Sequence, residues 1–87
     1  SPELSKLETA IITSAVGDNE TENFSEAAKK LKMVYDINPE INQEYLYYAA
    51  SSAVNSMDYN LALEYYLLLS DIKYEGIETK FYIDQLI

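Results

Sequence analysis

The 87-residue chain contains no cysteine, no histidine and no arginine. Without cysteine, neither a disulfide framework nor a thiolate metal site can form. Without histidine, the commonest proton carrier and metal ligand at neutral pH is missing. We therefore expect no metal site and no cofactor.

Positive charge is scarce. Six lysines face 15 acidic residues, which gives a net charge of −9 at pH 7. Such a charge repels phosphate backbones and anionic lipid headgroups, so neither nucleic acid nor a membrane surface is an expected partner. No apolar run approaches the roughly 20 residues of a membrane span, and no basic stretch followed by an apolar one marks a leader. The chain begins at Ser1 without methionine, which indicates a processed or excised segment whose export signal, if it had one, is already gone.

Glycine and proline are also few, with two of each, so the chain has little turn material for a many-stranded fold. Its apolar spacing is instead helical. One stripe with helical spacing consists of Phe24, Ala27, Ala28, Leu31, Val34 and Tyr35, and a second, offset by 35 residues, consists of Tyr59, Ala62, Leu63, Tyr66 and Leu69. The pattern predicts helices near 2–16, 24–37, 39–56 and 59–73, and a fifth over 77–87.

Capping residues mark the same helix starts. "SPEL" and "NPEI" place Ser1 and Asn38 as N-caps, each followed by proline and glutamate. Asn23 with Glu26 has the spacing of a capping box, and Asp58 precedes the fourth helix. The connection "GDNETEN", residues 17–23, is predicted to be about two residues longer than "NSMDY", residues 55–59.

A helix-turn-helix unit that recurs after about 34 residues is typical of helical arrays. The sequence resembles the tetratricopeptide repeat, most closely over residues 42–72 and least over 1–18. The positions that carry this resemblance are Leu46, Ala49, Ala50, Ala53, Tyr59, Ala62, Tyr66 and Leu69. The resemblance implies one all-α domain, an α-solenoid of antiparallel helix pairs, with repeats over 2–37 and 39–73 and the first helix of a third over 77–87. A small antiparallel helical bundle is the alternative.

One face of the third predicted helix is the candidate binding surface. If Leu46, Ala49, Ala50 and Ala53 face the core, the opposite side carries Glu44, Tyr47, Tyr48, Ser51 and Asn55. The resemblance implies that this side lines a concave groove for an extended peptide or a partner helix. Tyr47 and Tyr48 would pack on that ligand and Asn55 would bond its backbone; an ordinary wet helix face is the other interpretation. The basic residues of the family's carboxylate-binding grooves are missing, so a basic or neutral peptide is expected.

A structural role is the second hypothesis. The last predicted helix presents Phe81, Ile83, Leu86 and Ile87, which would be buried against another copy of the chain or against adjacent repeats of a longer array. An enzyme is not expected, because histidine, cysteine and arginine are absent and no phosphate loop or nucleophile elbow occurs. The resemblance extends to long repeat proteins that bacteria export to the envelope, while the sequence is equally compatible with the cytoplasm.

The sequence contains two clusters of charged residues. Asp18, Glu20 and Glu22 alternate in "GDNETEN", but Asn23 and Lys29 stand where an EF-hand needs glycine and a bidentate glutamate. A solvated acidic loop is therefore expected there. The only basic cluster, formed by Lys29, Lys30 and Lys32, is expected to pair with acidic residues on neighbouring turns.

Overall fold

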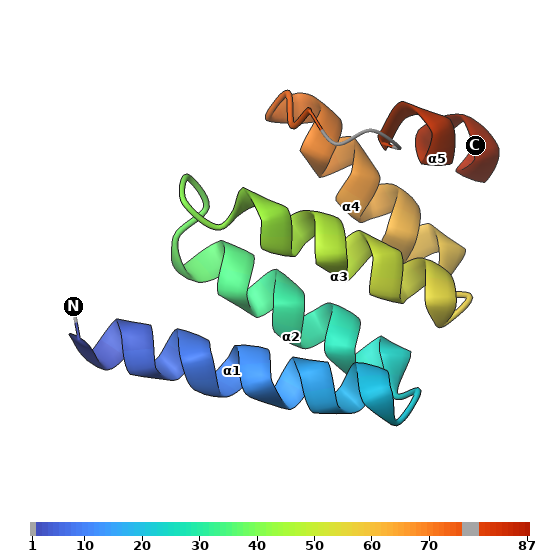
Figure 1. Ribbon diagram of the computed structural model, residues 1–87. Coiled ribbons are helices and arrows are strands. Elements are labelled where there is room, and N and C mark those ends of the chain that lie inside the picture. Colours follow the sequence, from blue (N-terminus) through green and yellow to red (C-terminus); the bar gives the residue numbers. More distant parts are fainter. Residues whose placement is uncertain (1, 76–78) are drawn as a thin grey trace.

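The computed structural model describes residues 2–75 and 79–87, and every regular element in these ranges is an α-helix (Figure 1). The elements are α1 (Pro2–Glu20), α2 (Phe24–Ile37), α3 (Gln43–Asn55), α4 (Tyr59–Asp71) and α5 (Thr79–Leu86). Close packing joins each helix to the one before it and the one after it. The predicted all-α class is confirmed, and this row of helices is what an array, rather than a closed bundle, requires.

Small and large apolar residues alternate in the core. The helix α3 contributes Leu46, Ala49, Ala50 and Ala53, all fully buried, so the predicted inward side of this helix is confirmed. Alanines let neighbouring helices approach closely, and the larger side chains then fill the space between them. The largest fully buried side chains are Tyr66, Leu46, Leu69 and Val34.

The 35-residue offset seen in the sequence also relates equivalent positions in the structure. Ala27 and Ala62 are both fully buried, and so are Val34 and Leu69. The turns that join the helices of each pair also match, because α1 ends at Glu20 and α3 at Asn55. The two pairs therefore follow one plan.

Backbone geometry at these two turns is the same. Glu22 and Met57, again 35 residues apart, each have a φ of 63°, the left-handed conformation that often ends a helix. The N–H of Asn23 donates to the carbonyl of Asp18 at 2.7 Å, and the N–H of Asp58 donates to that of Ala53 at 3.1 Å. These bonds satisfy carbonyls that the helix end leaves free.

The predicted end of the first helix is therefore wrong. We expected a helix over 2–16 and a connection two residues longer than that of the second pair, but α1 continues through Gly17 and Asp18 to Glu20. The Thr21 hydroxyl donates to the Gly17 carbonyl at 3.0 Å and supports the last turn. Gly17, Asp18 and Glu20 thus lie inside the helix, and only residues 21–23, with Glu22, form the turn.

The predicted start of the third helix is also wrong. Asn38 ends α2 instead of capping α3, and Pro39 lies in a turn. The helix begins four residues later than expected, with Asn42 at its N-cap. The buried Asn42 side chain donates to the Val34 carbonyl at 2.9 Å, which ties the start of α3 to the last turns of α2. This contact with the preceding helix decides the boundary.

The other caps gave mixed outcomes. Asp58 caps α4 as predicted, since its carboxylate accepts from the N–H of Leu61 at 3.2 Å. Asn23 occupies the N-cap of α2 but makes no side-chain capping bond, and its amide donates to Thr21 Oγ1 instead. The helix α4 ends two residues before its predicted end. The predicted cap at Ser1 and the predicted start of the fifth helix at 77 lie outside the described residues.

The lysine cluster does pair with carboxylates. Lys32 bonds Asp36 one turn away at 2.8 Å, and Lys29 lies 4.0 Å from Glu26. Lys30 instead crosses to α1, where its Nζ lies 2.6 Å from Asp18 and 2.8 Å from Ser14 Oγ. A partly buried polar contact therefore joins the first two helices.

Candidate interaction surface

The residues predicted for the outer side of α3 are unequally accessible. Glu44, Tyr48 and Asn55 are exposed, whereas Tyr47 and Ser51 are half-buried. The Tyr48 ring keeps 45% of its surface exposed, which is much for an aromatic side chain. The five residues thus follow one side of the helix without forming an enclosed site.

Tyrosine rings from the start of α3 are in contact with one another. Tyr48 meets Tyr45 edge-on at 5.8 Å between ring centroids and Tyr47 at 6.2 Å. Tyr47 in turn lies 5.8 Å from Tyr74, in the segment after α4, and 6.4 Å from Tyr66. Offset and edge-on pairs of this kind stabilise a surface beyond their buried area. Part of the Tyr47 ring is therefore covered by other tyrosines of the same chain.

The aromatic contacts continue into α5. Tyr82 stacks on Tyr66 at 5.0 Å with an interplanar angle of 12°, and Phe81 meets Tyr82 edge-on at 5.4 Å. Phe81 stands 35 residues after Leu46, yet it is 58% exposed while Leu46 is fully buried. Tyr82, rather than Phe81, takes the inward place on α5 through its stack on Tyr66.

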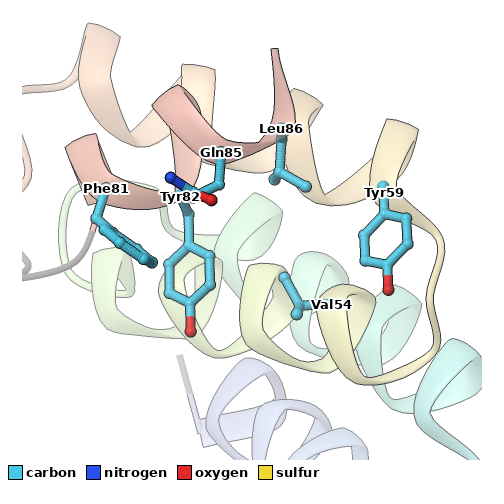
Figure 2. A pocket seen from close by; sticks show the side chains of 6 residues that line it. All are labelled: Val54, Tyr59, Phe81, Tyr82, Gln85 and Leu86. Atoms are coloured by element: carbon cyan, nitrogen blue, oxygen red, sulfur yellow. The ribbon is translucent and has the colours of Figure 1, made fainter.

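A hollow of about 480 Å³ lies between the end of α3, the start of α4 and α5. Figure 2 shows Phe81, Tyr82 and Leu86 extending from α5 toward Val54 and Tyr59. Its lining consists of Val54, Tyr59, Phe81, Tyr82, Gln85 and Leu86, none of them charged. Val54 follows Ser51 by three residues, so the outer side of α3 leads directly into this hollow.

The four apolar residues predicted to form an assembly surface on the last helix lie in different surroundings. Phe81 and Leu86 line the apolar hollow, while Ile83 lies beside a different one, together with Lys73 and Lys80. Ile87 is 86% exposed. The four residues therefore do not form one face.

Asn55 also lies apart from the tyrosines. It lines a hollow of about 510 Å³ between the two matching turns, beside Phe24 and Met57. The ligand hydrogen bond predicted for Asn55 would thus be made at the end of α3 that leads into the turn. Tyr48 lies two helical turns away, so the two side chains would serve different parts of a ligand.

Acidic side chains surround the exposed tyrosines. Partial burial, then the charges of Glu44, Tyr48 and Glu8, raise the pKa of Tyr45 above its ordinary value. Burial, then Tyr48 and Glu44, likewise raise the pKa of Tyr74. Neither Glu8 nor Glu44 takes part in an ion pair within residues 2–75 and 79–87. The surface is aromatic with unpaired negative charge.

No metal centre is evident. In the part of the chain that the structure describes, no three acidic, histidine or cysteine side chains come together as a metal site would need. Asp18, the first residue of the alternating acidic set, is bonded to Lys30. The helical backbone from Gly17 to Glu20 also lacks the looped path of a calcium site.

Sequence reasoning missed Val54, Tyr59, Tyr82 and Gln85 as members of this surface. Val54 had a signal, since it follows Ser51 by three residues on the same helix. Tyr82 and Gln85 had none, because their place depends on how α5 packs against α4.

None of the described helices is both long and apolar enough to cross a membrane. Comparison with protein-family models, curated proteins and solved structures gives no match.

Proposed function

We propose that the protein is a non-catalytic protein-interaction module of the tetratricopeptide type, which holds a peptide or partner segment along the outer side of α3. The observation that carries this proposal is the uncharged hollow beside Val54, at the end of that side. An apolar side chain of the partner fits such a lining, and the exposed Tyr48 supplies a broad contact surface.

Support for a non-catalytic role comes from the side chains available. Histidine and cysteine are absent, and the surface offers phenols, carboxylates and an amide. No nucleophile lies beside a base there, which acyl or phosphoryl transfer would require. Binding is the activity that such a surface performs best.

The test uses peptides selected from a random displayed library against the intact protein. Phe81→Ser should weaken binding of the selected peptides by about tenfold, because it removes one wall of the hollow. Phe81 is 58% exposed, so the fold should tolerate this change. Met33→Ser is the matched control, since Met33 is 52% exposed on α2 and lies outside the hollow. Equal binding by both variants would refute the proposed surface.

A second candidate function is assembly of the chain with copies of itself or with adjacent repeats. Two exposed apolar residues near the C-terminal end favour it, Phe81 on α5 and Ile87 directly after that helix. The net charge of −9 opposes it between identical copies. Light scattering over a hundredfold concentration range decides: a constant monomer mass supports the peptide surface, and a mass that climbs, then falls in Phe81→Asp, supports assembly.

A further inference from the structure

We propose that the start of α3 carries a binding site for an organic cation, the ammonium or guanidinium group of a lysine or arginine in the partner. Tyr45, Tyr48 and Tyr74 form its aromatic walls, and Glu44 supplies the charge. The identity of the cation as part of a protein rests on the proposed function, but the site can be tested without a partner.

Three tyrosines from two segments gather at this point. Tyr45 and Tyr48 belong to α3 and meet edge-on at 5.8 Å. Tyr74 follows α4 and is held beside them through Tyr47, whose ring lies 5.8 Å away at 35°. Tyr48 is 45% exposed, and Tyr45 and Tyr74 are half-buried. The rings thus form a supported surface that water and a ligand can reach.

Negative charge is concentrated at the same point. Glu44 acts on the phenols of both Tyr45 and Tyr74, and Glu8 reaches Tyr45 from α1. None of the charges that perturb these two phenols is positive. Lys73 and Lys80 line a hollow together with Tyr74, but neither lysine is among the charges that perturb the Tyr74 phenol.

Four of the six lysines are bonded to other carboxylates. Among the described residues, Lys29, Lys30, Lys32 and Lys80 pair with Glu26, Asp18, Asp36 and Asp84. Glu44 makes no ion pair among the described residues, and its charge acts on the phenols of Tyr45 and Tyr74. In a chain of net charge −9, a cation from outside is the complementary ligand.

The chemistry of the walls selects an organic cation. Aromatic faces are electron-rich and attract ammonium and guanidinium groups within about 6 Å. The structure shows this preference once inside the molecule, where Lys32 Nζ lies 5.7 Å from the Tyr35 ring centre and 6.0 Å from that of Tyr65. A divalent metal would need more carboxylate oxygens than these residues bring together.

The experiment titrates the intact protein with N-acetyl-arginine methylamide and N-acetyl-lysine methylamide, followed by NMR of the tyrosine ring signals. N-acetyl-norleucine methylamide, which has a similar stem without charge, is the control. We expect saturable shifts of Tyr45, Tyr48 and Tyr74 with at least one cationic probe, and none with norleucine. Equal shifts with norleucine, or no saturation with either cation, would overturn the site.

Two variants locate the cation. Glu44→Gln should weaken the cationic probe by about twofold to fivefold, the size of an exposed charge interaction. Tyr48→Leu should do the same by loss of its ring face. Glu64→Gln, an exposed change on α4, should leave the affinity unchanged. An equal loss in Glu64→Gln would mean general attraction to an acidic protein and would contradict the site.

The result is separable from that of the proposed function. If the cationic probes bind and no displayed peptide is selected, the cation site stands and the peptide surface fails. If selected peptides bind through Phe81 but neither cationic probe gives saturable shifts, the peptide surface stands and the cation site fails.

Discussion

The two complete helix pairs, α1–α2 and α3–α4, share one backbone plan but fill one place in it with different chemistry. In the first pair, Lys30 bonds Asp18 and Ser14 across the two helices. At the positions 35 residues later, the second pair has Tyr65, Ala53 and Ala49, all buried. An ion pair and an aromatic ring on alanines thus occupy corresponding sites.

This difference shows which part of the plan is required. The buried positions shared by both pairs, such as Ala27 with Ala62 and Val34 with Leu69, are apolar in each. In the first pair the variable position lies nearer the surface, where the Lys30 side chain keeps 30% of its area exposed. Polar pairs are tolerated there because solvent lowers the cost of burying their charges.

The largest expected effect on stability comes from shortening a leucine on α4, compared with the same change on α1. Leu69→Ala removes a fully buried side chain and should lower the free energy of unfolding by about 2–5 kcal/mol. Leu7→Ala on α1, where the side chain is 50% exposed, should change it by less than about 0.5 kcal/mol. Urea denaturation followed by circular dichroism measures both. Similar losses in the two variants would mean that α1 hides an apolar contact that its exposure does not reveal.

The helix caps distinguish the two pairs at an intermediate level. Asp58→Ala should cost about 1 kcal/mol, because its carboxylate accepts the N–H of Leu61 at the start of α4. Asn23→Ala, at the same position of the first pair, should cost only a few tenths of that, about 0.3 kcal/mol, because no side-chain capping bond exists there. Thermal unfolding of the two variants compares them directly, and a larger loss at Asn23 would contradict this assignment.

The smallest expected effect concerns the position where the two pairs differ, that of Lys30, Asp18 and Ser14. Lys30→Met should destabilise the protein by about 0.5–1 kcal/mol, since it leaves the Asp18 carboxylate without its partner and solvent screens part of the cost. The combined change Lys30→Tyr, Asp18→Ala and Ser14→Ala copies the second pair and should recover most of that loss.

Lys80→Met is the control, because the Lys80–Asp84 pair is largely exposed. Denaturant midpoints of the three proteins test the comparison. A triple variant less stable than Lys30→Met would show that the two pairs are not interchangeable at this position.

Much of the fold was predictable because it depends on local patterns. The apolar spacing gave α2 its exact observed bounds, Phe24–Ile37, and the inward side of α3 from Leu46 to Ala53. Asp58 was recognisable as a cap because capping involves residues only three apart. Such features are fixed within one or two helical turns.

The errors have a common origin in contacts between helices. The start of α3 was placed at residue 39 from the Asn-Pro pair, but the bond from Asn42 to Val34 of α2 sets it later. Phe81 stands 35 residues after the buried Leu46, but the stack on Tyr66 turns Tyr82 inward instead. No spacing within one helix carries that information.

For the candidate surface, the sequence by itself determined the composition: tyrosines with carboxylates on the outer side of α3, in a chain with excess negative charge. Only the tertiary structure decided which residues from other segments lie beside them. Packing of α5 on α4 created the hollow beside Val54, and the turn after α4 brought Tyr74 to Tyr47 and Tyr48. Helical periodicity sets the side on which a residue lies, while packing between helices sets which residues meet across it.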